Sequence, residues 1–242
     1  MLDLQNLRKA FDDHVAVAGL SFTLNKGEVL GFLGQNGAGK STTMRMVSGV
    51  LEPDSGDALI NGRSIVTDRR NAQSQIGYLP EGAPLYRDMT PVTFLRFMAD
   101  AHGLPSKTRK DAIERVIADA RIASVAGKPI AALSKGYRRR VGLAAALIHD
   151  PPVLLLDEPT DGLDPIQKRA VRALVARMAP EKAIVISTHT LDEVPAMCSR
   201  VIVIDQGQVV ADDTPAALSD SKPGGLEEAF ILLADAREAE TC

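Results

Sequence analysis

The chain has 242 residues, of which 45% are hydrophobic and 24% are charged, and its formal net charge is −3. A chain of this length can bury a substantial core, either as one extended α/β domain or as a domain with an inserted part. The mildly acidic balance gives no basic surface for duplex nucleic acid, so we expect no nucleic-acid partner.

The two cysteines, Cys198 and Cys242, show neither metal-ligand spacing nor a disulfide framework, which favours a reducing cytosol. The first residues lack a signal-peptide pattern, and no apolar run approaches the roughly 18 residues that a membrane-spanning helix needs. We therefore expect a cytoplasmic chain that does not cross a membrane by itself.

The chain opens with a pattern typical of antiparallel strands. Residues 2–7 and 20–24 alternate apolar and polar side chains, and residues 25–28 form a turn. Phe11 lies in the connection between the two strands, where its surroundings in the sequence favour a half-buried loop aromatic.

Residues 34–42, GQNGAGKST, match the phosphate-binding loop pattern of Gly, four residues, Gly, Lys and Ser or Thr. The apolar run 29–33 predicts a buried strand before the loop, and residues 42–50 predict a helix after it. Backbone amides and a helix N-terminus would then face an anion, with Lys40 adding charge for the outer phosphates. The loop predicts a nucleotide triphosphate site whose binding residues are Gly34, Asn36, Gly37, Ala38, Gly39, Lys40, Ser41 and Thr42, with the Ser41 hydroxyl on Mg²⁺.

Residues from about 90 to 150 predict a mostly helical insertion. Short strands are expected first, at residues 57–60 and 76–79. Thr90 then caps a helix that runs to about His102, Ser106 caps a second helix, and a third follows Gly136. Simple phosphate-loop kinases seldom carry an insertion at this place.

The last third of the chain alternates strands and helices, which predicts a mostly parallel sheet. Residues 153–157 form an unalternating apolar run, typical of a central strand that is covered on both faces. The further expected elements are a helix at 165–178, a strand at 183–187, a hairpin at 201–210, a helix from 226 to about 234, and a frayed tail at 236–242.

Two acids end the central strand of residues 153–157. Asp157 is placed to hold magnesium through water, and Glu158 to orient and deprotonate an attacking water. The alternative is a solvated turn, which an acidic pair after four core aliphatics disfavours. His189 follows another buried strand, so it would emerge at the same sheet edge and contact the γ-phosphate. The other histidines, at 14, 102 and 149, have no such context and are expected to be surface or packing residues.

Five motifs together resemble an ATPase subunit of the ABC transporter family in their order and spacing. The resemblance spans about residues 2–235 and leaves 236–242 as a tail. The motifs are the phosphate loop, LSKGY at 133–137, LLDE at 155–158, DGLD at 161–164 and STH at 187–189. The second of these, the signature motif, is specific to this family among phosphate-loop proteins.

The resemblance implies the ABC ATPase fold, in which a phosphate-loop core carries an N-terminal antiparallel β subdomain and an inserted helical subdomain. It also implies a head-to-tail dimer, with each ATP between one phosphate loop and the signature motif of the second subunit. Ser134 and Gly136 would present amides and a helix dipole to the γ-phosphate. Phe11 corresponds to the aromatic that stacks on adenine, Glu158 to the catalytic base and His189 to the switch histidine.

Four positions depart from the family pattern. Glu81 stands where a glutamine is usual, Lys135 and Tyr137 are atypical in the signature motif, and Asp161 replaces a common serine. A carboxylate at position 81 still binds magnesium, so we expect the metal ligands Ser41, Glu81 and Asp157. We expect ATPase activity to be retained, with Glu158, His189, Lys40 and Glu81 as the catalytic residues.

Residues 76–81, 84–86 and 133–138 resemble the ATPase subunits of bacterial type-2 exporters, in particular the gliding-motility-associated branch. This resemblance implies export through a separate transmembrane permease, a second ATPase subunit, expected to be a copy of this chain, and a peripheral position on the inner face of the membrane. Arg138, Arg139 and Arg140 are expected to form a solvated face or a dimer and coupling surface. The alternatives are an ABC ATPase that acts as a nucleotide-gated switch in a cytosolic assembly, and a small-molecule kinase.

Overall fold

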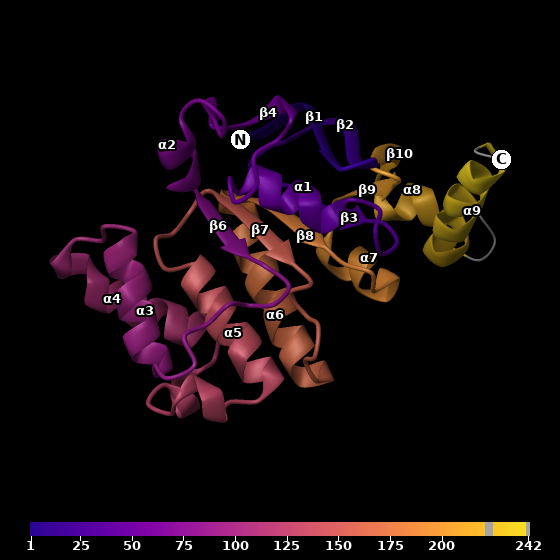
Figure 1. Cartoon of the computed structure of the whole chain (residues 1–242). Coiled ribbons are helices and arrows are strands. Elements are labelled where there is room, and N and C mark those ends of the chain that lie inside the picture. The colour runs from indigo at the N-terminus through magenta and orange to yellow at the C-terminus, as the bar shows by residue number, and fades with distance from the viewer. Residues whose placement is uncertain (221–224, 241–242) are drawn as a thin grey trace.

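The computed structural model describes residues 1–220 and 225–240, which form two sheets surrounded by helices (Figure 1). The smaller sheet is antiparallel, with the strand order β2-β1-β4-β5. Its strands are longer than predicted, because β1 and β2 continue to a tight turn, and Phe11 therefore ends a strand. The strands are β1 (Leu2–Phe11), β2 (His14–Leu24), β4 (Ser55–Ile60) and β5 (Arg63–Ser64).

The larger sheet has the order β10-β9-β3-β8-β7-β6 and is parallel except for β10, which pairs antiparallel with β9. This arrangement confirms the predicted mostly parallel sheet. The strands are β3 (Val29–Leu33), β6 (Ile76–Leu79), β7 (Val153–Asp157), β8 (Ala183–Ser187), β9 (Arg200–Asp205) and β10 (Gln208–Asp213).

Both faces of the larger sheet are buried, which explains its continuous apolar strands. In β7, Val153 and Leu155 face a core shared with α1 (Lys40–Val47) and the smaller sheet. Leu154 and Leu156 point to the opposite core, which includes residues of the predicted helical insertion and of the helix at 165–178. The strand therefore keeps the period of two, but both sets of side chains are apolar because neither meets water.

The predicted helical insertion is present as α3, α4 and α5, which lie together at the lower left of Figure 1, away from the smaller sheet. Thr90 caps α3 as predicted, because its Oγ1 accepts a hydrogen bond from the Thr93 amide. Ser106 is instead the first residue of α4 and makes no cap bond. The helices are α2 (Arg69–Gln73), α3 (Pro91–Ala101), α4 (Ser106–Asp119), α5 (Lys135–Ala146), α6 (Pro165–Met178), α7 (Val194–Met197), α8 (Pro215–Asp220) and α9 (Gly225–Glu240).

The helix α9 extends six residues past the predicted end at 234, so most of the expected tail is helical. Residues 235–240 include Ala, Arg and Glu, which are strong helix formers, and this propensity accounts for the extension. Residues 241–242 of the predicted tail lie outside the described residues. Within the described ranges, no helix combines the length and the apolar character needed to cross a membrane.

The three consecutive arginines do not form the predicted solvated face. Arg139 and Arg140 are only 3% and 7% exposed. Each guanidinium donates to backbone carbonyls of a neighbouring segment: Arg139 to residues 80 and 81, and Arg140 to Arg121. The solvated-face prediction was wrong for these two arginines because α5 is packed on the segments that carry the accepting carbonyls, and arginine can be buried when carbonyls accept its hydrogen bonds. The alternative, a dimer and coupling surface, stays a prediction.

His149, which follows α5, stacks on His102 with ring centroids 3.7 Å apart, and its Nε2 donates to the Ile76 carbonyl at 3.1 Å. Burial lowers the pKa of His149 from its ordinary value of 6.5 to about 4. The unfolded chain therefore binds the proton first as the pH falls through 6.5. Stability is lost between pH 6.5 and about 4, and is retained above this window.

We expect the His149→Gln variant to lose less free energy of unfolding than the wild type between pH 7 and pH 4.5. The difference should be about 1–2 kcal/mol, allowing for the partial exposure of the ring. Denaturant unfolding at a series of pH values measures it, with His14→Gln, at an exposed position, as the control. Parallel pH profiles for the wild type and His149→Gln would contradict this expectation.

Candidate nucleotide site

A cavity of about 490 Å³ brings together most of the predicted site residues. It lies where the loop after β3 and the carboxyl ends of β7 and β8 meet the turn between β1 and β2. Gly34 and Ala38 belong to the same loop without lining the cavity, and neither Ser134 nor Gly136 lines it. The lining residues are Phe11, His14, Ala16, Asn36, Gly37, Gly39, Lys40, Ser41, Thr42, Glu81, Asp157, Glu158, Asp161 and His189.

The phosphate-binding loop needs glycine at its close contacts. Gly39 has φ of 104°, and a Cβ there would lie 2.4 Å from the Ala16 carbonyl oxygen, so only glycine fits. The helix α1 begins at the next residue, and its free amides therefore open onto the cavity. This is the geometry in which a helix N-terminus binds phosphate groups.

Lys40 is 8% exposed, and its Nζ donates to the carbonyl oxygens of Gly34 at 2.6 Å and Gln35 at 3.0 Å. Burial lowers the pKa of the Lys40 ammonium, while three nearby carboxylates act in the opposite direction. The loop carbonyls thus hold the cation at the cavity wall, where it can exchange them for phosphate oxygens.

Glu158 is the most constrained acid of the site. Its φ is 52°, in the left-handed region that non-glycine residues rarely adopt, and such strain is concentrated at functional sites. One carboxylate oxygen accepts from the backbone amide of His189 at 3.0 Å and from its Nδ1 at 2.7 Å. The other accepts from Thr188 Oγ1 at 3.3 Å. These bonds fix the direction of the carboxylate.

His189 joins the buried acid to the open part of the cavity, because its side chain is 63% exposed while that of Glu158 is 11% exposed. A ring with a proton on both nitrogens donates to Glu158 through Nδ1 and can donate to an anionic ligand through Nε2. The pair can therefore orient a water through the carboxylate and contact an anionic group through the imidazole.

The donor set fits magnesium better than a transition metal. Asp157, 3% exposed, accepts a hydrogen bond from Ser187 Oγ, and it lines the cavity together with Ser41 and Glu81. Across the residues that the structure describes, no group of three or more His, Cys, Asp or Glu side chains is arranged to hold a metal. Magnesium is commonly held by one or two carboxylates with phosphates and water, so this sparse oxygen set suits it.

Sequence reasoning missed Glu193, which is 2% exposed behind the acidic pair. Its carboxylate accepts from Thr160 Oγ1 at 2.5 Å and pairs with Lys168 at 2.8 Å and Arg172 at 3.4 Å. It thereby ties the segment after Glu158 to α6. Asp192 stands next to it in the sequence, and nothing in the local pattern indicates which of the two acids is buried.

Two further residues at the cavity were not predicted. His14, expected to be a surface or packing residue, lines the cavity on the same side as Phe11. Asp161 also lines it and forms an ion pair with Lys135 of the signature motif at 2.7 Å. Phe11 is 44% exposed, with Lys9 Nζ 5.7 Å from its ring centroid, so its ring has a face available for stacking.

Comparison with known proteins gives one consistent family. A profile described as ABC transporter matches residues 17–161. Nod factor export ATP-binding protein I of Sinorhizobium fredii is 39% identical over 224 residues, which cover 92% of this chain and 65% of the relative. The chain thus spans slightly less than two thirds of that relative. The linearmycin resistance ATP-binding protein LnrL of Bacillus subtilis is 35% identical over 242 residues, covering 96% of this chain and 78% of the relative.

Solved structures of ATP-binding subunits have the same fold as this chain. An ATP-binding subunit of an ABC transporter superposes with a TM-score of 0.88 at 27% identity, covering 96% of this chain and 99% of that one. The cbiO1 protein of Clostridium perfringens, part of an ABC transporter complex, gives a TM-score of 0.79 at 28% identity, covering 95% and 94%. A dimeric cassette, MJ0796 bound to ADP and Pi, has the same fold, with a TM-score of 0.80 at 21% identity and coverage of 88% and 98%.

Proposed function

The chain belongs to the ABC transporter family as an ATP-binding subunit with the ABC ATPase fold. From this premise, we propose that it hydrolyses ATP to drive export through a separate membrane subunit. The family match confirms the predicted family and fold. The observation that carries the proposal is the position of Glu158, held by His189 and Thr188 beside the phosphate-binding loop.

In the proposed reaction, the amides of residues 37–42 and the Lys40 ammonium bind the phosphates, and Phe11 stacks on the adenine. Ser41, Asp157 and Glu81 would hold Mg²⁺, which when bound neutralises charge on the phosphate oxygens. Glu158 accepts a proton from the water that attacks the γ-phosphorus, and the bond between that phosphorus and the oxygen of ADP breaks, which releases ADP and inorganic phosphate. His189 keeps the Glu158 carboxylate in place through Nδ1 and, with a proton on both ring nitrogens, donates to the γ-phosphate through Nε2.

A second subunit is part of this proposal. Ser134 and Gly136 stand at the N-terminus of α5, whose amides would bind an anion, but they do not line the nucleotide cavity of their own chain. A head-to-tail dimer would bring them to the γ-phosphate held by the other subunit. Asp164, the cap of α6, would lie at the same contact.

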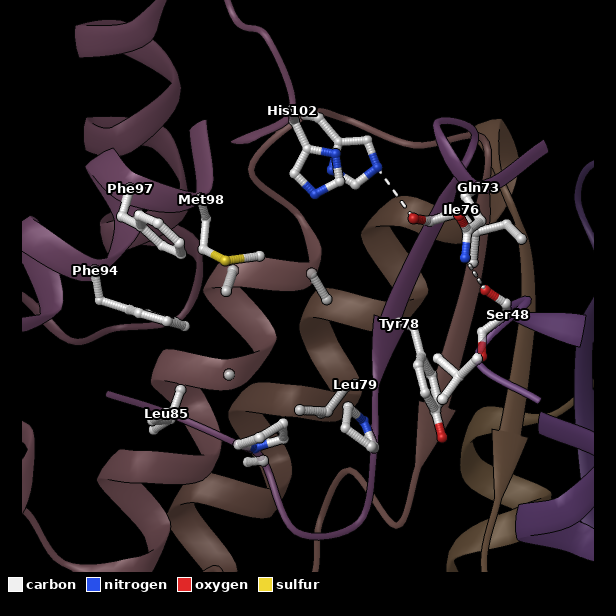
Figure 2. A pocket seen from close by; sticks show the side chains of 18 of the residues that line it. Ser48, Gln73, Ile76, Tyr78, Leu79, Leu85, Phe94, Phe97, Met98 and His102 are labelled. Carbon is white, nitrogen blue, oxygen red and sulfur yellow. Dashed lines mark hydrogen bonds between the residues drawn. The ribbon is translucent and has the colours of Figure 1, made fainter. Parts of the chain in front are cut away.

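We further propose that the membrane subunit docks in a groove of about 760 Å³ between β6, α3 and α5, the docking groove. Figure 2 shows Phe94, Phe97 and Met98 of α3 projecting toward the same hollow as Leu79 of β6. In the described part of the chain, no charged side chain lines it. Exposed aromatic surface of this kind marks protein interfaces.

The docking groove also has a direct connection to the nucleotide site. Residues 80–86, the Glu81 loop, place Glu81 in the nucleotide cavity and Ala83 to Tyr86 in the groove. The ring of Tyr86 meets Phe97 edge-on at 5.4 Å and is 56% exposed. A partner bound on these rings would hold the chain at the inner face of the membrane. Because Glu81 and Tyr86 belong to the same loop, a movement of Glu81 would be transmitted to this partner.

The test of the function is co-purification from detergent-solubilised membranes, using a tagged Glu158→Gln protein with ATP and magnesium present. We expect a multi-spanning membrane protein in near-equal amount, identified by mass spectrometry. Recovery of soluble partners alone would contradict the transporter function and favour a cytosolic switch.

The Phe97→Asp substitution should reduce recovery of the membrane protein by about tenfold, because it places an unpaired charge among apolar contacts of the docking groove. ATP turnover by the purified chain should remain within about twofold, since Phe97 does not line the nucleotide cavity. The matched control is Val209→Asp, at an exposed apolar position on β10 away from the groove. Equal recovery with both variants would contradict the proposed docking site.

A further inference from the structure

The Glu81 loop is flanked by a third cavity, of about 480 Å³, which lies between the nucleotide site and α5. Glu81 and Asp161 line both this cavity and the nucleotide cavity, and Ala83 lines both this cavity and the docking groove. On the opposite side stand Lys135, Arg138 and Arg139 of α5. The loop and the signature helix therefore face each other across a polar space.

Arg139 bridges the two elements. Its Nη1 donates to the Pro80 carbonyl at 2.7 Å and to the Glu81 carbonyl at 2.5 Å. The residue is 3% exposed, so these charge-assisted bonds are formed away from water. Its Nε and Nη2 find no hydrogen-bond partner among residues 1–220 and 225–240. The buried guanidinium thus makes its hydrogen bonds to a single loop.

The backbone of α5 also lies directly against this loop. A Cβ at Gly142 would come within 3.1 Å of Ala83 Cβ and 3.9 Å of Ala83 Cα in the loop, and within 2.9 Å of the Leu79 side chain of β6, so glycine allows this close approach. Together with the bonds of Arg139, this contact fixes the loop to the helix at two points.

The charge of Arg139 faces the nucleotide site. Burial lowers the pKa of its guanidinium, and four carboxylates act in the opposite direction: those of Asp157, Asp161, Glu158 and Glu81. A fixed cation behind these acids reduces their mutual repulsion. Glu81 adds a carboxylate to this group and so increases the repulsion. The positive charge of Arg139 therefore reduces the repulsion more with a carboxylate at position 81 than it would with a neutral side chain there.

We propose that Arg139 is a positioning residue for ATP hydrolysis, which fastens the loop that carries Glu81 to the helix that carries Ser134 and Gly136. The inference rests on the proposed function and deepens it. Because of this bridge, the loop and the signature helix move as one unit. The position of the Glu81 side chain beside Ser41 and Asp157, which would hold magnesium with it, therefore depends on Arg139.

The test compares Arg139→Gln with Arg140→Gln in the purified full chain. Both variants remove a buried guanidinium from α5, but Arg140 donates to Arg121 at 2.8 Å in the helical insertion and not to the Glu81 loop. We expect Arg139→Gln to lower kcat about tenfold with KM for ATP within about twofold, because the phosphate-binding loop is untouched. Arg140→Gln should change kcat less than about twofold. Arg139→Lys, which keeps the charge but loses the planar fork, should be intermediate.

A double-mutant cycle with Glu81→Ala separates positioning from general damage. If Arg139 acts through Glu81, Arg139→Gln should have almost no further effect on kcat in the Glu81→Ala background. Additive losses, or equal losses for Arg139→Gln and Arg140→Gln, would overturn the inference. If Arg139→Gln does not fold, Arg139→Lys takes its place in the cycle. No further effect in the Glu81→Ala background would then support the inference, and additive losses would overturn it.

A wild-type chain without ATP turnover would instead refute the proposed function.

Discussion

Replacing Glu158 with glutamine should lower ATP turnover by about 10²- to 10⁴-fold, the range for loss of a general base. Glutamine keeps the size of the side chain and can still accept from the His189 amide, which the carboxylate contacts at 3.0 Å. It cannot take a proton from water. ATP binding should remain within about threefold, because the phosphate-binding loop and Lys40 are unchanged.

Phosphate release by the purified chain and by the membrane-reconstituted complex measures this effect, and calorimetry measures ATP binding. The matched control is Glu181→Gln, which removes an exposed acid paired with Lys26 far from the cavity. ATP should also stabilise a dimer of Glu158→Gln, visible by size-exclusion chromatography with ATP and magnesium. Turnover of the variant within a few-fold of the wild type would show that another group is the base.

The nucleotide cavity could be predicted because its acids end parallel strands. Continuous apolar runs identify β7 and β8 as buried strands, and parallel pairing brings their carboxyl ends to one edge. In the structure Asp157 pairs with Ser187, which in turn pairs with Phe32 of the strand that leads into the phosphate-binding loop. The loop, the acidic pair and His189 each follow a parallel strand of the same sheet. Their positions in the sequence therefore predict that they lie together at one edge of the sheet.

The supporting residues could not be predicted, because their partners are distant in the sequence. Arg139 contacts carbonyls 58 and 59 residues away, and Glu193 meets Thr160 at a separation of 33. The helical pattern of α5 gives no indication that a loop covers its arginines. Likewise, the ion pair of Lys135 with Asp161 joins two positions that differ from the family pattern, and only the fold shows that they meet.

Ser134→Asp should lower ATP turnover at least about 10²-fold, comparable to the loss of an oxyanion-stabilising donor. Ser134 caps α5, with its Oγ accepting from the Tyr137 amide at 3.3 Å, and aspartate is an equally good cap, so the helix should be preserved. The new negative charge would repel the γ-phosphate held by the second subunit. Ser134→Asn is the control, because asparagine also caps helices and carries no charge.

A site shared between two subunits predicts that two inactive variants restore ATP turnover when they are mixed. Lys40→Met lacks the ammonium of the phosphate-binding loop but keeps Ser134, whereas Ser134→Asp keeps Lys40. A mixed head-to-tail dimer contains one site with both residues intact. An equimolar mixture should therefore recover about a quarter of wild-type phosphate release, because about half of the dimers are mixed and each has one intact site of two. A site confined to one chain would leave the mixture as inactive as its components, so this outcome would contradict the dimer and leave Glu158 as the base of a monomeric enzyme.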